Sequence, residues 1–140
     1  LLIPGNHETA EEVENIAKKN KSIINLHNNF FEFKDVLFYG YGTGGFAQVD
    51  KKFELLMPKI KAKLKKDKKI VFITHAPIYK TKLDKLFSGH QGNKSTRRFI
   101  EEVQPFLVLC GHFHENEKKE DKIGKTKIMN PGNDGMIIEI

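Results

Sequence analysis

The sequence predicts an α/β fold in which parallel β-strands alternate with helices. Two uninterrupted apolar runs, at residues 69–75 ("KIVFITH") and 105–114 ("PFLVLCGHFH"), are typical of strands that are buried on both faces of a sheet. About 25 residues of predicted loop and helix separate the two runs, which is long enough for a crossover between parallel strands. The chain has 140 residues, of which 39% are hydrophobic and 30% charged, so we expect residues 1–140 to form one globular domain or part of one.

The first half of the chain is predicted to contain two helices with short strands between them. Residues 9–20 have Thr9 as a suitable N-cap, acidic residues in the first turn and lysines in the last, an order that suits the helix dipole. Residues 22–42 are rich in β-branched and aromatic residues and predict short strands separated by turns. Residues 50–69 carry apolar side chains at helical spacing, and Pro58 either begins this helix or kinks it.

The second half continues the alternation. The strand "KIVFITH" is followed by a predicted loop at residues 76–93 and a helix at residues 95–103. Asn93 or Ser95 caps this helix, or else its N-terminus attracts a phosphate group. The last residues, 122–140, predict strands that turn at "NPGNDG".

Charge and cysteine content restrict the cellular setting and the partners. The 24 Lys and Arg residues exceed the 18 Asp and Glu residues, which gives a formal net charge of +6. Such a lysine excess is more typical of a solvated surface than of a nucleic-acid interface, so nucleic acid is not the favoured partner. Cys110 is the only cysteine, which excludes an intrachain disulfide and favours a reducing compartment. No apolar run approaches the roughly 20 residues that span a bilayer, so we expect a soluble, cytoplasmic protein without a membrane partner.

Three segments share one pattern, an apolar run followed by polar residues that include histidine. They are "LLIPGNHE", "KIVFITHAP" and "FLVLCGHFHE". Because the carboxyl ends of neighbouring parallel strands meet at one edge of a sheet, where open α/β sheets bind their ligands, we expect these polar side chains to converge. The residues concerned are Asn6, His7, His75, His112 and His114.

The third segment predicts metal coordination. In an extended segment, His112 and His114 project from the same side, roughly 6–7 Å apart at the backbone. Two such imidazoles can each reach a different ion of a pair that lies about 3.5–4 Å apart. Asn6 adds a neutral oxygen, which suits a divalent ion of intermediate hardness such as Mn or Fe.

These motifs also resemble those of a known family. In this order, "GNHE", the histidine His75 after a buried strand and "GHFH" are similar to the motifs of the calcineurin-like metallophosphoesterases, in particular the small prokaryotic single-domain phosphoesterases. The segments "SGHQGNKSTRRFIEEVQP" and "NPG" are similar to that subgroup too, so the resemblance covers essentially the whole chain. It implies an α/β sandwich of two mixed β-sheets flanked by helices.

The resemblance further implies a function and a role for each residue. The implied function is metal-dependent hydrolysis of phosphodiesters or phosphomonoesters by a hydroxide that bridges two divalent ions, with Mn favoured over Fe, Zn or Ni. His7 would face the phosphate and protonate the leaving oxygen. Apart from the resemblance, His90 lies in the loop between the ligand strands and is favoured as an ordinary loop residue, with substrate binding as the alternative. The implied metal ligands are Asn6, His75 and His112 for one ion and His114 for the other.

The chain departs from the family pattern at its beginning. The family has an Asp-x-His on its first strand and a Gly-Asp-x-x-Asp on its second, and neither occurs before Asn6. Without the carboxylate that bridges the ions, we expect the second ion to bind weakly, because two close divalent cations repel strongly. We therefore expect the sequence to be the C-terminal part of a longer phosphoesterase, with the N-terminal strands missing, an incomplete active site and no activity by itself.

Two other functions are compatible with the sequence. A naturally shortened, inactive relative would keep the fold as a non-catalytic scaffold that binds a protein. A nuclease or nucleic-acid binder would use the lysine-rich residues 51–69, and its affinity would fall steeply with salt. That stretch offers only Phe53 as an aromatic residue among its cations, and the chain keeps each histidine of the family pattern that it can contain, so the enzyme is favoured.

Overall fold

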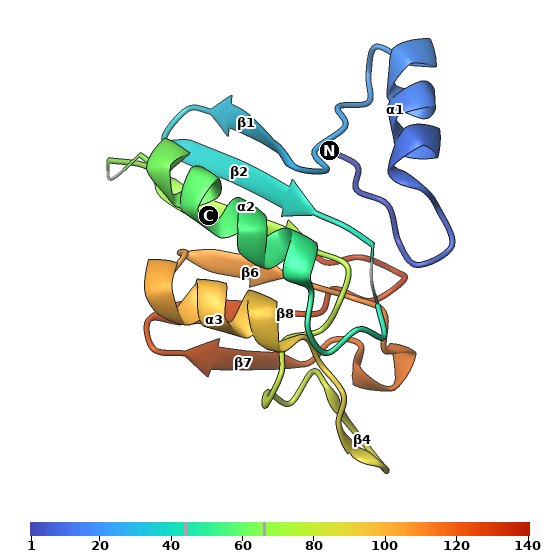
Figure 1. Ribbon diagram of the computed structural model, residues 1–140, viewed down its shortest axis with the longest axis vertical. Helices are drawn as coiled ribbons and strands as arrows, with labels where there is room; N and C mark the ends of the chain where they lie inside the picture. Colours follow the sequence, from blue (N-terminus) through green and yellow to red (C-terminus); the bar gives the residue numbers. More distant parts are fainter. Residues whose placement is uncertain (44, 66) are drawn as a thin grey trace.

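The computed structural model of the protein describes residues 1–43, 45–65 and 67–140 (Figure 1). In chain order its helices and strands are α1 (Ala10–Lys19), β1 (Asn29–Phe33), β2 (Val36–Tyr41), α2 (Lys51–Lys63), β3 (Lys69–Thr74), β4 (Lys85–Leu86), β5 (Gly89–His90), α3 (Lys94–Val103), β6 (Leu107–Leu109), the 3₁₀ helix η1 (His114–Asn116), β7 (Glu120–Ile123) and β8 (Thr126–Met129).

Six of the strands form one mixed sheet in the order β1-β2-β3-β6-β8-β7. The four central strands, β2, β3, β6 and β8, run parallel, and the edge strands β1 and β7 pair antiparallel with their neighbours. The predicted crossover is confirmed, because β3 and β6 are adjacent and parallel, with Phe72 opposite Val108. Strands β4 and β5 form a separate hairpin within the loop that precedes α3. The described residues therefore form one large mixed sheet and this small hairpin.

Helices α2 and α3 lie side by side on one face of the sheet (Figure 1). Phe53 of α2, Phe72 of β3 and Phe99 of α3 are buried between them, and their ring centroids lie 5.2–5.9 Å apart. Burying an aromatic side chain of this size contributes roughly 1.5–3 kcal/mol to stability. The opposite face of the sheet carries a smaller buried cluster, formed by Val36, Val71, Leu107 and Met129.

Side chains cap the N-termini of α1 and α3, as the sequence predicts. The Thr9 hydroxyl accepts a hydrogen bond from the Glu12 N–H at 3.1 Å, and the Glu12 carboxylate accepts one from the Thr9 N–H at 2.7 Å. This reciprocal pair is a capping box, which satisfies two of the free N–H groups of α1. Asn93, one of the two residues expected to cap α3, accepts a hydrogen bond from the Thr96 N–H.

Helix α2 is shorter than the predicted helix over residues 50–69. It begins after Asp50, whose side chain caps it, continues through Pro58 and ends at Lys63, so that Lys69 already begins β3. Lys66, which falls within the predicted range, lies outside the described residues. None of the helices in the described part of the chain is long and apolar enough to cross a membrane.

Two predicted strands are wrong at their ends. Strand β6 ends at Leu109, and the chain turns at His112, whose backbone has a positive φ of 72°. The strand predicted for residues 136–140 is absent from the described residues, since β8 ends at Met129. The chain then passes Gly132 and Gly135, which both have positive φ and turn it away from an extended path.

Candidate metal centre

Three side chains from distant parts of the sequence meet at one point. Nε2 of His75 lies 2.9 Å from Oδ1 of Asn6 and 3.1 Å from Nδ1 of His112. Nδ1 of His112 lies 3.3 Å from the same Asn6 oxygen. The three atoms therefore form a nearly equilateral triangle, although 69 and 106 positions separate Asn6 from the two histidines.

The parallel sheet brings the two histidines together. His75 directly follows β3, and His112 follows the adjacent parallel strand β6, so both lie at the carboxyl edge of the sheet. A hydrogen bond of 3.1 Å from the Gly111 N–H to the His75 carbonyl joins the two loops. Asn6 is positioned by a tight turn before α1, in which the Glu8 carboxylate accepts a hydrogen bond from the Gly5 N–H at 2.9 Å.

The ring of His112 is held in place by strain and by close packing. Its backbone φ of 72° is rare for a residue other than glycine, and conformations of this kind cluster at functional sites. The ring of Phe46 packs edge-on against it, with centroids 4.5 Å apart. Gly45 also packs against the ring, since a Cβ atom at this position would lie only 2.5 Å from Cε1 of His112. Position 45 must therefore lack a side chain for the ring to stay where it is.

Both histidines of the triangle are kept neutral. Burial lowers the pKa of His75 below its usual range, and the neighbouring His112 lowers it further. Burial likewise lowers the pKa of His112, with a further contribution from His114. A neutral imidazole has a free lone pair, which is the form that binds a metal ion.

The three donor atoms fit one divalent ion. Two ligand atoms that lie about 2.1 Å from one ion and at right angles to each other are about 3.0 Å apart, close to the observed distances of 2.9–3.3 Å. Hydrogen bonds alone satisfy the triangle poorly, because Asn6 Oδ1 has no proton and each neutral ring has only one. Within the described residues, the buried Nε2 of His112 has no hydrogen-bond partner, which leaves Nδ1 as the nitrogen with partners.

Of the three donors, only His75 and His112 belong to the residue types, His, Cys, Asp and Glu, that usually bind metal ions. Among the described residues, no group of three or more His, Cys, Asp and Glu side chains could hold a metal ion. The third donor is the amide oxygen of Asn6, so the site is built from neutral ligands. Such a set suits Mn, Fe, Ni or Zn better than it suits a soft ion that prefers thiolates.

The other two residues of the predicted cluster lie outside the triangle. His7 is exposed beside Asn6, close enough to His75 and His112 that it contributes to lowering the pKa of both. His114 begins η1, and its side chain is 72% exposed. The extended conformation predicted for residues 112–114 is wrong, since the chain turns at His112 and enters a helix at His114. His112 and His114 nevertheless both line a hollow of about 150 Å³.

Sequence reasoning missed the partner of His114. Its Nδ1 lies 2.9 Å from Oε1 of Glu117, and Asn133 Nδ2 lies 3.2 Å from the same nitrogen. A carboxylate on one ring nitrogen fixes the tautomer and leaves the other nitrogen free, an arrangement typical of histidines that bind metals. The spacing of three residues between His114 and Glu117 was the available signal, because in a helical turn it places two side chains together.

His90 also has a carboxylate partner that the sequence did not reveal. Its Nδ1 lies 2.6 Å from Oδ1 of Asp84, which is fully buried. The Asp84 carboxylate accepts three further hydrogen bonds, from the backbone N–H groups of Lys80, Thr81 and Gly92. The imidazole, with 36% of its side chain exposed, is thus oriented by a buried negative charge. No pattern in the sequence marks a pair that forms across a short hairpin.

Comparison with known proteins is consistent with this geometry. A family model described as calcineurin-like phosphoesterase matches residues 1–116. The chain is 31% identical over 140 residues to "Uncharacterized protein MJ1162" of Methanocaldococcus jannaschii, a match that covers 94% of the chain and 62% of that protein.

Two solved structures share the fold. The crystal structure of TT1561 of Thermus thermophilus matches with a TM-score of 0.69 and 20% identity, over 93% of this chain and 61% of that one. Another crystal structure matches with a TM-score of 0.74 and 17% identity, over 93% and 56% of the two chains. The α/β fold with a helix-flanked mixed sheet is thereby confirmed, and the chain spans 56–62% of the length of these proteins.

Proposed function

Because the chain belongs to the calcineurin-like phosphoesterase family, we propose that it contributes the histidine-rich side of an active site that hydrolyses phosphodiesters or phosphomonoesters. The observation that carries this proposal is the triangle of Asn6, His75 and His112, whose donor atoms lie 2.9–3.3 Å apart. Hydrolysis of a phosphate ester at neutral pH needs an activated water and a means to offset the negative charge around phosphorus.

Asn6, His75 and His112 would hold one divalent ion, for which Mn is the favoured identity and Fe, Zn or Ni the alternatives. Such an ion lowers the pKa of a water molecule and polarises phosphoryl oxygens. The neutral state of the two imidazoles supports this role, because protonated rings would exclude the ion. The strained backbone of His112 supports it as well, since it holds one donor in a fixed direction.

His114 is the proposed ligand for a second ion. Glu117 holds its Nδ1, which leaves Nε2 as the nitrogen for coordination. A second ion at this nitrogen would need carboxylate ligands in addition to His114. This side of the site is therefore proposed to work only when such ligands are supplied.

His7 is the proposed general acid. His7 is exposed, directly follows Asn6 in the sequence and acts electrostatically on His75 and His112, so a phosphate ester at the triangle would be near its ring. A protonated ring nitrogen of His7 would donate its proton to the leaving oxygen as the bond from phosphorus to that oxygen breaks. His75 and His112 would be occupied by the ion, so neither ring is free for this role.

His90 is the proposed substrate-binding residue. Asp84 holds its Nδ1, so that its Nε2 is the nitrogen available to a substrate oxygen. The loop of residues 45–49 links it to the metal centre: Gln48 donates a hydrogen bond to the His90 carbonyl, and Phe46 packs on His112. His90 would therefore contact the part of the substrate that extends beyond the phosphate.

The proposal is tested with metal binding and turnover measured separately. The full-length protein, the Asn6→Ala and His112→Ala variants and the control Asn15→Ala, an exposed asparagine on α1, are titrated with Mn²⁺ and assayed with a chromogenic phosphodiester. We expect the two ligand variants to bind Mn²⁺ at least tenfold more weakly and to lose turnover, while the control keeps both. Equal Mn²⁺ affinity and equal rates in all four proteins would refute it.

A non-catalytic scaffold is the second candidate, because within the described residues the three donors of the triangle include no carboxylate. It predicts Mn²⁺ binding that depends on Asn6 and His112 without measurable turnover of any phosphodiester or phosphomonoester by the full-length protein. The same titration and assay therefore separate the two functions.

A further inference from the structure

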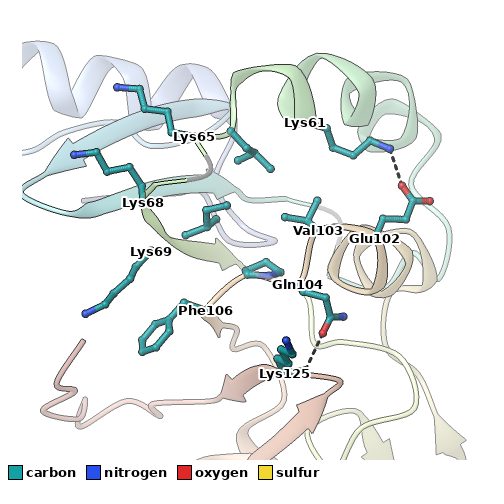
Figure 2. Close-up of a pocket in the computed structure, with 12 residues that line it drawn as sticks. Lys61, Lys65, Lys68, Lys69, Glu102, Val103, Gln104, Phe106 and Lys125 are labelled. Atoms are coloured by element: carbon teal, nitrogen blue, oxygen red, sulfur yellow. Dashed lines mark hydrogen bonds and ion pairs between the residues drawn. The ribbon is translucent and has the colours of Figure 1, made fainter.

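A hollow of about 630 Å³ lies far from the candidate metal centre, between the C-terminal ends of α2 and α3 and the beginnings of β3 and β6 (Figure 2). Lys69 at its edge is the first residue of β3, and His75 follows the last one. At about 3.3 Å per residue, these two positions are about 20 Å apart along the strand. The hollow therefore opens at the amino edge of the sheet and shares no residue with the triangle of Asn6, His75 and His112.

The hollow has an apolar floor and a basic rim. Its apolar lining comes from the end of α2, from β3 and from the segment between α3 and β6, and consists of Leu64, Ile70, Val103, Pro105 and Phe106. Its cations come from the same elements and from the turn between β7 and β8, and they are Lys61, Lys65, Lys68, Lys69 and Lys125. A volume of this size lies within the range of small-molecule sites, about 300–1,000 Å³.

The lysines of the rim are only partly neutralised. Lys61 pairs with Glu102 at 2.7 Å, and Lys69 lies 3.5 Å from Asp35. Lys65 and Lys68 converge on the single carboxylate of Glu32. Among the described residues, four of the five lining lysines thus pair with three carboxylates, and Asp67 acts on Lys68 as a fourth, so the rim keeps a small excess of positive charge over an apolar floor. A ligand that complements this site carries negative charge on one side and a flat apolar surface on the other.

Phe106 supplies an aromatic surface beside these charges. It is 47% exposed, although a phenylalanine normally buries its ring, and Nζ of Lys69 lies 5.5 Å from the ring centroid. Figure 2 shows Phe106 and Lys69 next to each other, with Lys68 and Lys65 along the same rim. The lysine-rich stretch 51–69 had only Phe53 as an aromatic residue, and Phe53 is buried in the core, so the fold supplies the missing ring from another segment.

We propose that this hollow, here called the lysine groove, binds a nucleotide. The base would stack on Phe106 and the floor, and the phosphates would lie against the ammonium groups of Lys65, Lys68, Lys69 and Lys125. Stacking on an aromatic ring and contact with a basic surface are the two interactions by which proteins bind nucleotides without reading a base sequence. The nucleotide unit is either free or part of a single strand, since both carry the same chemistry.

The lysine groove is independent of the proposed phosphoesterase site. It neither uses the metal ligands nor requires turnover, so its binding is measured in EDTA, where no divalent ion remains to hold phosphates at the triangle. The His112→Ala variant should bind nucleotide with unchanged affinity, because its side chain lies at the other edge of the sheet. A negative result for metal binding therefore does not refute nucleotide binding, and a negative result for nucleotide binding does not refute metal binding.

The test uses probes that separate base from phosphate. ATP, inorganic triphosphate and adenosine are titrated against the protein by calorimetry. We expect ATP to bind at least tenfold more tightly than either triphosphate or adenosine, because only ATP uses both halves of the groove. A short single-stranded oligothymidylate is titrated in parallel, and whichever of ATP or oligonucleotide binds more tightly identifies the free or the strand form.

A matched pair of phenylalanine variants tests the stacking surface. Phe106→Ala should weaken ATP binding about tenfold, to the affinity of inorganic triphosphate, whereas Phe106→Trp should retain or strengthen it. Phe33→Ala is the control, because Phe33 is also exposed beneath a lysine, with Lys34 Nζ 5.4 Å from its ring, and does not line the groove. Thermal unfolding of each variant checks that it folds.

Charge variants complete the test. Lys125→Ala should weaken ATP and triphosphate binding several-fold, and Lys52→Ala, an exposed lysine of α2 outside the groove, should not. Equal affinity for ATP and triphosphate, or equal losses in Phe106→Ala and Phe33→Ala, would overturn the proposal, because the groove would then attract anions only through its net charge.

Discussion

Replacing Gly45 by alanine is expected to disable the candidate metal centre without unfolding the protein. An alanine Cβ at this position would lie 2.5 Å from Cε1 of His112 and 2.8 Å from both ring nitrogens. Ordinary contact begins at 3.4 Å, so the ring must move by about 0.9 Å. Because Nδ1 of His112 lies 3.1–3.3 Å from its two partners, such a shift opens two of the three sides of the triangle.

The expected loss is 10- to 100-fold in Mn²⁺ affinity, or about 1.4–2.7 kcal/mol, which is the usual effect of disturbing the residues that orient a metal ligand. Calorimetric titration of the metal-free protein with Mn²⁺ measures it. Gly111→Ala is the matched control, because a Cβ at Gly111, directly before His112 in sequence, meets no atom within 4 Å. Undiminished Mn²⁺ affinity in Gly45→Ala, or an equal loss in Gly111→Ala, would refute the idea that packing against position 45 fixes the ring of His112.

Four further outcomes follow from the structure. Burial lowers the pKa of His27 below its ordinary value of about 6.5, as it does for His75 and His112. At a pH between the folded and the unfolded pKa, the unfolded chain therefore binds more protons than the folded one. The metal-free protein should therefore keep its full stability above about pH 6.5 and lose it as the pH falls, and His27→Gln should flatten this decline in urea titrations. Asp84→Asn should cost about 3 kcal/mol in urea unfolding, since an amide cannot accept from three backbone N–H groups and His90 at once. Burial raises the pKa of Cys110 to about 12, so iodoacetamide should modify the thiol only after unfolding, and fast labelling of the native protein would contradict its burial. Titration of the metal-free 140-residue chain with Mn²⁺ should give one bound ion per chain, and a stoichiometry of two would show that His114 completes a second site without further ligands.

The elements that depend on local signals were predictable from the sequence. The capping box of Thr9 and Glu12 fixes the start of α1, and the apolar run of residues 69–75 marks the central strand β3. The convergence of His75 and His112 also followed, because two buried strands joined by a crossover must be parallel and end at one edge. Each of these inferences used residues that lie close together in the chain or a rule of topology.

The features that escaped prediction depend on contacts between distant residues or on backbone conformation. The positive φ of His112 turns the chain where an extended strand was expected, and with it the side chain of His114 points to Glu117. Gly45 matters because the fold places it against a ring 67 positions later, and no spacing in the sequence indicates that. The pair of Asp84 and His90 forms across a hairpin of two-residue strands, which are too short to show an alternating pattern.

The neutral ligand set of the triangle also explains why one ion and not two is expected here. Two divalent cations about 4 Å apart repel by about 16 kcal/mol at an effective dielectric constant of about 20. Neutral donors such as Asn6, His75 and His112 do nothing to reduce that repulsion, whereas a bridging carboxylate does. A single ion held by them would keep its full charge of +2, which the carboxylates of Glu8 and Glu115, whose charges reach His75 and His112, would offset only from outside the triangle. A phosphate ester is an anion, and an ion left short of negative ligands binds it more strongly than a fully neutralised one would.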